Sequence, residues 1–194
     1  MASFADFQQK AHNSEVATYD HLSKLPKGKT VVPKIYVAKM FSDCNPLKGY
    51  IIMEYIQNIE IDILASFSLR EVKQVLRFKA IVEASSIDVP PEHRKDFFDA
   101  PFGKMAELFL PEEEVNKAIE TLRTVEGGRL ANEAQRLQGI VPELLDFEWV
   151  DNLADELGMD RVLCHGDLYP MNTLWKQGDN GLELAAVIDY QVSE

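Results

Sequence analysis

The segment Val162–Gln191 constrains the fold of this chain more than any other, because polar residues stand at fixed places between apolar, strand-like stretches. The stretch RVLCH ends at His165, and a loop follows that contains Asp167 and, five residues later, Asn172. After the stretch TLW and the polar turn KQGDNG, the apolar stretch ELAAVID ends at Asp189. Turn formers between apolar runs predict a β-hairpin here. The segment is therefore expected to fold as strand, loop and hairpin, with carboxylates at two of its strand ends.

These residue types suit phosphoryl transfer, in which a protein mainly positions the reactants and neutralises charge. Asp167 can accept the proton of an attacking hydroxyl, which makes it the candidate catalytic base. Asn172 and Asp189 are hard oxygen ligands of the kind that magnesium prefers, and magnesium usually takes only one or two from protein. A zinc site is disfavoured, because Cys164 and His165 are adjacent and no second His/Cys pair has ligand spacing.

The wording HGDLYPMNTLW followed by AAVIDYQ resembles the catalytic loop and metal-binding strand of the aminoglycoside-phosphotransferase and choline-kinase superfamily. It is most similar to the CHK kinase-like branch, which includes ecdysteroid-kinase-like proteins. Gly166 stands where protein kinases carry arginine, and Asp189 lies in Ile-Asp-Tyr-Gln rather than Asp-Phe-Gly, so small-molecule kinases are favoured. The resemblance implies that Asp167 is the catalytic base, that Asn172 and Asp189 bind magnesium, and that His165 holds the loop in register.

The N-terminal third predicts a helix followed by a hairpin. Apolar residues at helical spacing indicate one amphipathic helix over residues 3–24, which Pro26 and Gly28 end. Val31–Phe41 and Tyr50–Ile56 are strand-like, and turn formers separate them. We therefore expect a β-hairpin with a long loop.

The resemblance extends to this region with three further residues. Glu15 matches the glutamate that pairs with a phosphate-binding lysine in the family, and main-chain groups near Glu54 and Ile56 would hold adenine. The family's glycine-rich loop and its lysine have no counterpart before Glu15, where Lys10 is the only lysine. The family's helices beyond the metal-binding strand have no counterpart either. Electrostatic preorganisation is usually the largest catalytic contribution, so we expect weak or no kinase activity from this chain alone. A two-stranded sheet is also marginal alone, which predicts low stability.

The middle of the chain is expected to be mostly helical. After the connector Ile59–Ser68, apolar residues predict a long helix to Ser86 with a buried face formed by Leu69, Val72, Val75, Leu76, Ile81 and Val82. The stretch VPPEHRKDFFDAPFG is expected to be irregular, because it contains proline and glycine. Further helices are predicted from Pro111 to Gly127-Gly128, over 130–138 and over 142–157.

These elements predict an α+β protein with a partial protein-kinase-like fold. Residues 1–58 would form an incomplete N lobe, a helix plus a two-stranded hairpin, with a hinge at its end. Residues 59–194 would form a mostly helical C lobe with a catalytic-loop hairpin, truncated after the metal-binding strand.

Composition limits the partners. The formal net charge of −12 argues against binding to nucleic acid or to an anionic membrane, but an anionic nucleotide can still be held by local groups. Cys44 and Cys164 form no disulfide framework, the N-terminus lacks the pattern of a signal peptide, and no apolar run approaches about 20 residues. A cytoplasmic location is expected.

The functional prediction is an ATP-dependent phosphotransferase that acts on a hydroxyl of a small molecule, in a truncated form. ATP and magnesium are its cofactors by resemblance, and its partners are the nucleotide and a small hydroxylated substrate. The alternative is a catalytically inactive kinase-fold protein that acts by binding a partner or a nucleotide. Comparing ATP turnover of the wild type with that of Asp167→Asn discriminates the two.

Overall fold

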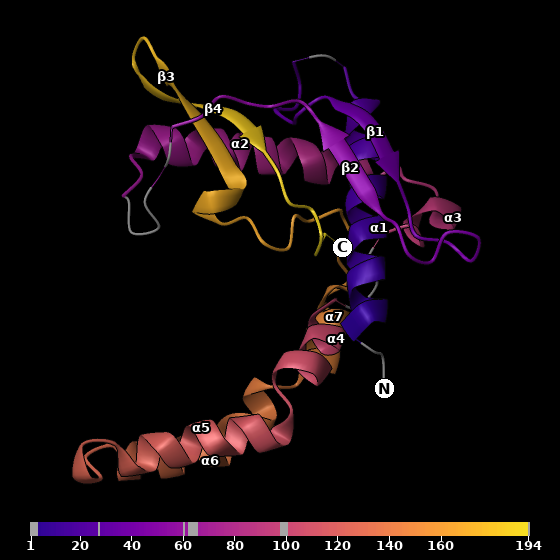
Figure 1. Ribbon diagram of the computed structural model, residues 1–194. Coiled ribbons are helices and arrows are strands. Elements are labelled where there is room, and N and C mark those ends of the chain that lie inside the picture. The colour runs from indigo at the N-terminus through magenta and orange to yellow at the C-terminus, as the bar shows by residue number, and fades with distance from the viewer. Residues whose placement is uncertain (1–3, 27, 60, 62–65, 98–100, 194) are drawn as a thin grey trace. The chain divides into compact units, whose positions relative to one another are not determined.

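A computed structural model gives the fold and describes residues 4–26, 28–59, 61, 66–97 and 101–193 (Figure 1). The chain forms two compact units. One consists of Met1–Phe4 and Ala100–Met159, and the other of Ala5–Asp99 and Asp160–Glu194. The division into lobes at residue 58 remains a prediction. No helix in the described part of the chain is both long and apolar enough to cross a membrane.

The larger unit contains the predicted helices and hairpins. Its elements are α1 (Phe4–Ser23), β1 (Ile35–Lys39), β2 (Tyr50–Met53), α2 (Leu69–Ser86), α3 (Pro91–Arg94), the 3-10 turn η2 (Pro170–Asn172), β3 (Thr173–Gly178) and β4 (Gly181–Val187). The predictions of the first helix, of both hairpins and of the long helix are thereby confirmed. Helix α2 begins where predicted because Ser68 and Glu71 form a capping box that satisfies two free backbone donors.

The stretch RVLCH is not a strand, so that prediction is wrong. Its backbone finds a different partner: the Leu163 N–H donates to the Ser86 hydroxyl at the end of α2, at 2.7 Å. A buried N–H needs only one acceptor, and here a side chain supplies it instead of a neighbouring strand. The extended segment is thereby held against α2 as it approaches the loop that follows.

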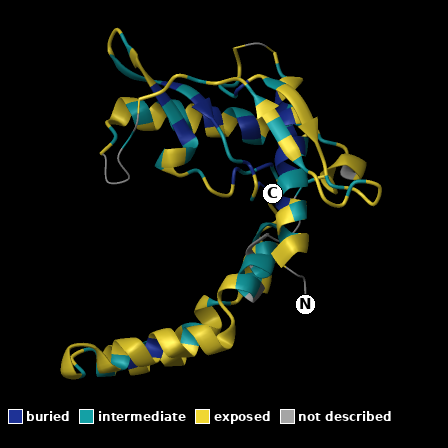
Figure 2. Ribbon diagram, viewed as in Figure 1, coloured by how far each residue is buried: buried dark blue, intermediate teal, exposed yellow. Residues whose placement is uncertain are grey.

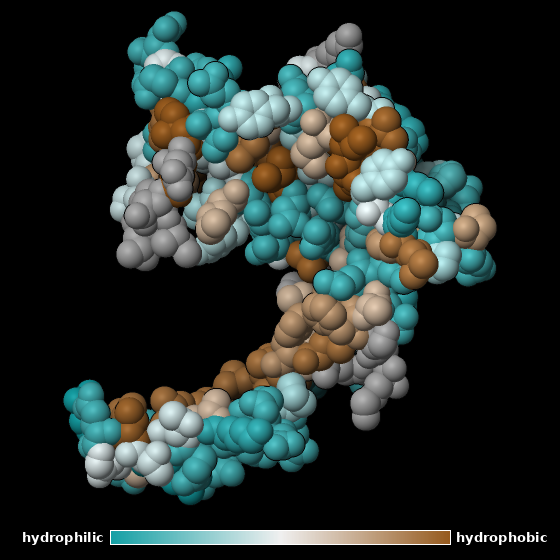
Figure 3. Space-filling model, viewed as in Figure 1, coloured by the Kyte–Doolittle hydropathy of each residue, from teal (hydrophilic) through white to brown (hydrophobic). Residues whose placement is uncertain are grey.

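Both sheets in the described residues are two-stranded and antiparallel. In the first, Ile35 pairs with Met53 and Ala38 with Ile51, with a bulge between Ile35 and Val37. The inner face of this hairpin packs on the core. Figure 3 shows apolar and tyrosine side chains over its outer face, where the exposed residues are Tyr36, Val37, Tyr50 and Ile52.

The core of the larger unit joins α1, α2, β3, β4 and the segments around them (Figure 2). Its buried residues are Tyr19, Leu22, Phe78, Val82, Leu163, Trp175, Leu184, Val187 and Tyr190. The predicted buried face of α2 is only partly right. Val82 is buried, whereas Leu69 and Leu76 are 70% and 56% exposed. Phe78, Val82 and Ser86 recur every four residues and form the inner face of the helix. Leu69 and Leu76 therefore lie on the opposite side.

The smaller unit is helical. It contains α4 (Pro101–Phe109), α5 (Glu112–Thr124), η1 (Val125–Gly127), α6 (Ala131–Leu144) and α7 (Phe147–Glu156). Helix α5 packs on α6, with Ile119 and Ala134 buried, and α4 packs on α7. The Gly103 N–H donates to the Asp151 carboxylate at 3.0 Å and ties the second pair together.

Two predictions for residues 89–157 are wrong, one of an irregular stretch and one of the start of a helix. The stretch expected to be irregular contains α3 and the start of α4, and its residues 98–100 lie outside the described residues. Proline stands at the first position of both helices, where its missing N–H costs nothing. Pro142 lies inside α6 rather than starting a helix. The break comes after Leu144, and Asp146 begins α7 by accepting the Trp149 N–H at 2.9 Å.

Candidate functional site

The loop after His165 turns at Gly166, which has a φ of +75°. A Cβ on this residue would lie 2.8 Å from the carbonyl carbon of Val192 and closer still to its oxygen. Both the left-handed conformation and the close approach therefore require glycine. The turn presses the loop against the segment that follows β4, so the two halves of the motif lie in contact.

His165 joins these two halves. Its Nε2 lies 3.0 Å from the Ile188 carbonyl, and the Asp167 N–H donates to its Nδ1 at 3.3 Å. These partners assign the proton to Nε2, so the ring is neutral with both nitrogens occupied. Burial lowers the pKa of His165, which agrees with a neutral ring. The histidine is placed to hold the loop, and neither nitrogen is free to move a proton to a substrate.

Asp167 and Asn172 lie side by side, as their spacing predicted. The Asn172 Nδ2 donates to the Asp167 carbonyl at 2.9 Å and to its carboxylate oxygen Oδ2 at 3.2 Å. Asp167 is exposed to solvent. The main-chain carbonyl of Asn172 accepts the Ile188 N–H at 2.9 Å, which brings the loop next to the end of β4.

Asp189 is the residue after Ile188 and has a φ of +66°. Few residues other than glycine adopt this conformation, and it marks a turn that is held by its surroundings. Glu15 of α1 comes close to this turn. Glu15 is buried, and desolvation, followed by the negative charge of Asp189, raises its pKa. The structure therefore brings five predicted residues into one region: His165, Asp167, Asn172 and Asp189, together with Glu15 from the far end of the chain.

Glu15 contacts the backbone N–H of Tyr190 and the side chain of Gln191. No lysine or arginine of the described chain forms an ion pair with it. The expected pairing of Glu15 with a phosphate-binding lysine remains a prediction of the resemblance. Two carboxylates, Glu15 and Asp189, thus lie near each other, and neither forms an ion pair with a lysine or arginine of the described chain.

The polar network that docks α1 was missed by the sequence analysis. The Ser14 hydroxyl donates to the Ser193 carbonyl at 3.0 Å, and the Thr18 and Ser193 hydroxyls lie 2.8 Å apart. Ser14 and Thr18 are four residues apart on the buried face of α1. The four-residue spacing of Ser14 and Thr18 is evident in the sequence, but nothing in the sequence indicates that Ser193 is their partner.

Tyr190 was also missed. Its ring is fully buried and lies 4.6 Å from the His165 ring and 5.1 Å from the Tyr19 ring, between centroids. Burial raises the pKa of Tyr190, and its hydroxyl has no hydrogen-bond partner among the described residues. The Tyr190 ring packs against the His165 ring and helps to hold it in place.

Glu54 and Ile56 lie apart from this cluster. The Glu54 N–H donates to the Lys34 carbonyl at 2.8 Å, and its carboxylate accepts the Lys34 N–H at 3.2 Å, which extends the first hairpin. Beyond them, the Ile59 N–H donates to the Trp175 carbonyl at 2.7 Å. The predicted adenine-binding segment therefore runs to β3, and no hydrogen bond or ion pair among the described residues joins Glu54 or Ile56 to Asp167.

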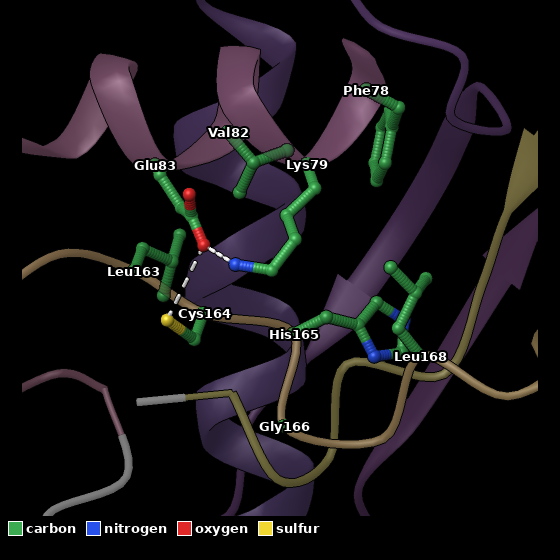
Figure 4. Close-up of a pocket in the computed structure, with 9 residues that line it drawn as sticks. All are labelled: Phe78, Lys79, Val82, Glu83, Leu163, Cys164, His165, Gly166 and Leu168. Atoms are coloured by element: carbon green, nitrogen blue, oxygen red, sulfur yellow. Dashed lines mark hydrogen bonds and ion pairs between the residues drawn. The ribbon is translucent and has the colours of Figure 1, made fainter. Parts of the chain in front are cut away.

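A cavity of about 220 Å³ lies on the other side of the loop (Figure 4). Phe78, Val82 and Leu163 supply apolar wall, and Gly166 lies at its edge. Within it Lys79 and Glu83 of α2 form an ion pair, and the Cys164 thiol donates to Glu83 at 3.7 Å. None of these side chains was a predicted site residue.

The residues present fit a magnesium ion. No group of three His, Cys, Asp or Glu side chains in the described ranges could hold a metal alone. Magnesium does not need such a cage, because it takes one or two protein oxygens and completes its shell with water and phosphate. The Asn172 Nδ2 donates to Asp167, so the Oδ1 of Asn172 would be the atom that meets a magnesium ion, and the Asp189 carboxylate would be the second protein ligand.

The fold and the site together define an α+β protein in which a His-Gly-Asp loop and a strand-ending aspartate meet at one place. The sequence model of the family DUF1679, described as "Uncharacterized oxidoreductase dhs-27", matches residues 1–194. The chain belongs to this family. No curated protein and no solved structure matches it.

Proposed function

We propose that this chain carries the catalytic side of an ATP-dependent phosphotransferase that acts on a hydroxyl group of a small molecule. One observation carries the proposal: Asp167 and Asn172 are joined by a hydrogen bond, and the Asn172 carbonyl binds the backbone next to Asp189. These contacts support the proposal because they bring the proposed base, Asp167, near the proposed magnesium ligands Asn172 and Asp189, and phosphoryl transfer needs such a set.

In the proposed reaction, the hydroxyl oxygen of the substrate attacks the γ-phosphorus of ATP. The bond from that phosphorus to the β–γ bridging oxygen breaks, and ADP leaves. The hydroxyl proton passes to the exposed Asp167 carboxylate and then to solvent. The Asn172 amide fixes the direction of that carboxylate through its 3.2 Å hydrogen bond. His165 holds the loop and is a positioning residue.

Asn172 and Asp189 would hold magnesium, which when bound neutralises the charge of the phosphates. Glu15, beside Asp189, adds negative charge that favours a cation at this place. The main chain near Glu54 and Ile56 is proposed to contact adenine, as the resemblance implies.

The family's description contains the word oxidoreductase, which refers to the protein named there and not to this chain. For this chain, the residues favour phosphoryl transfer. A dinucleotide site of the common kind uses a Gly-x-Gly-x-x-Gly turn after a strand of a parallel sheet. The sequence contains no such glycine pattern, and both sheets in the described residues are antiparallel hairpins.

The alternative of a non-catalytic, binding protein has one observation in its favour. Glu15 forms no ion pair with a lysine or arginine of the described chain, whereas the resemblance implies that the corresponding glutamate of active small-molecule kinases pairs with a lysine. A chain of this kind could bind a nucleotide without turning it over.

The test separates binding from turnover. ATP binding is measured by isothermal titration calorimetry with and without magnesium, and release of ADP is measured with a panel of small alcohols. We expect magnesium-dependent ATP binding that Asp189→Asn and Asn172→Ala abolish, while Asp167→Asn keeps binding and loses the weak ADP release expected of the wild type. Asp179→Asn, in the turn between β3 and β4, is the control and should change neither.

ATP binding that is indifferent to Asn172 and Asp189, or no binding at all, would overturn the proposal. Binding that depends on both residues, with ADP release equal in wild type and Asp167→Asn, would support the non-catalytic alternative.

A further inference from the structure

The outward face of α2 carries a row of cations. Arg70, Lys73 and Arg77 are spaced three and four residues apart, so they lie along one side of the helix over about 10 Å. All three are exposed. Lys176 of β3 lies at the same groove. We call these four residues the basic stripe.

The basic stripe borders a groove of about 740 Å³ between α2 and the β3–β4 hairpin. The walls of this groove are fixed relative to each other by Gln74. Its amide donates to the Leu182 carbonyl at 3.0 Å and accepts the Leu184 N–H at 3.0 Å. Arg70 also donates to the Asn180 carbonyl in the turn of the hairpin. The groove is therefore preformed, and a ligand would not have to order it.

The charge of the basic stripe is poorly compensated. Lys73 and Arg77 form no ion pair with a described residue, and Lys176 has only Glu183 at 3.7 Å, on the surface. Such a concentration of positive charge stands out on a chain with a net charge of −12. The electrostatic complement of the basic stripe is an anionic partner, which the acidic remainder of the chain would repel and this stripe would attract.

A second row runs beside the basic stripe. Leu69, Val72 and Leu76 repeat at the same spacing and are 70%, 40% and 56% exposed. We call these residues the apolar stripe. Adjacent exposed apolar side chains on one helix face are a mark of an interaction surface. An inorganic polyanion or a nucleic acid would leave the apolar stripe in water, whereas a peptide with leucine-like and acidic side chains would cover both rows.

We infer that this face of α2 and the groove beside it form a docking site for an acidic amphipathic helix of a partner protein. A helix presents side chains at the same three- and four-residue spacing as the two stripes, so its carboxylates can meet Arg70, Lys73 and Arg77 while its apolar residues cover Leu69 and Leu76. This site is separate from the phosphotransferase residues and stands without them.

The experiment uses the full chain and a fluorescein-labelled helical peptide with glutamates on one face and leucines on the adjoining face, followed by anisotropy. We expect saturable binding that weakens as salt rises. Lys73→Glu/Arg77→Glu should weaken it by about tenfold or more, and Leu76→Ser by about threefold or more. The control is Lys29→Glu/Lys48→Glu, which makes the same charge change at exposed sites elsewhere and should weaken binding less than about twofold.

Circular dichroism should show that each variant keeps its helix content, because all the changed side chains are exposed. Equal weakening by the control pair would reduce the effect to net charge and overturn the proposal. Peptide binding that Leu76→Ser leaves unchanged, together with equal binding of sodium polyphosphate, would assign the site to a simple anion. A concentration-dependent dimer that Lys73→Glu/Arg77→Glu dissociates, seen by light scattering, would assign it to a second copy and overturn the proposal as well.

Discussion

The substitution Gly166→Ala tests how tightly the catalytic loop is held against the segment after β4. Alanine at a φ of +75° costs about 1–2 kcal/mol in backbone strain. Its Cβ would also lie 2.8 Å from the Val192 carbonyl carbon, well inside van der Waals contact, and no flexible side-chain end can yield there. Overpacking of this kind adds about 1–3 kcal/mol. The free energy of unfolding should therefore fall by about 2–5 kcal/mol in all.

The matched control is Gly28→Ala. Gly28 has a φ of +80°, but an added Cβ would meet no atom within 4 Å. It should therefore cost only the backbone strain of about 1–2 kcal/mol. Urea denaturation followed by circular dichroism measures both free energies, and the slope against urea should stay the same. Equal losses for Gly166→Ala and Gly28→Ala would refute the claim that the loop rests on the Val192 backbone.

Three further predictions concern the buried groups around the site. Glu15→Gln should stabilise the chain at pH 7, because burial and Asp189 raise the pKa of Glu15 above 4.5 and so disfavour its charged form in the folded state. Thermal unfolding measures this gain in stability, which should vanish as the pH falls below 4.5, where Glu15 is protonated in both states. Tyr190→Phe removes a buried hydroxyl without a described partner and should leave stability unchanged or raise it by about 1 kcal/mol, so a clear loss would reveal a hidden hydrogen bond. Burial lowers the pKa of His165, so the unfolded chain binds the proton more readily and stability should fall as the pH drops below 6.5. His165→Asn should flatten this part of the curve of unfolding free energy against pH, and an unchanged slope would contradict the assignment of a neutral, buried His165 ring.

The elements that the sequence predicted well are those with strong local signals. Helix α2 has a periodic pattern and a Ser68–Glu71 capping box, and both hairpins are marked by turn formers between apolar runs. The failures arise where a tertiary contact decides. RVLCH looks like a strand, but its backbone bonds to Ser86, a residue 77 positions away from Leu163. Nothing in the stretch itself indicates that partner.

The candidate site divides in the same way. The five-residue spacing of Asp167 and Asn172 placed them on one loop, and the structure joins them by a hydrogen bond. The approach of Glu15 to Asp189 could not be derived from spacing, because it depends on how α1 docks against the segment after β4. Tyr190 was read only as part of a motif, although it is a fully buried ring against His165.

The contact between Ser14 and Ser193 spans 179 residues of sequence. A ribosome that adds about 5–20 residues per second needs roughly 10–35 s to make that length of chain. Helix α1 therefore emerges well before the segment that buries its inner face, with Tyr19 and Leu22 exposed in the meantime. During biosynthesis the buried face of this helix therefore stays without its partner for that time, and Glu15 can approach Asp189 only after residues 189–193 have been made.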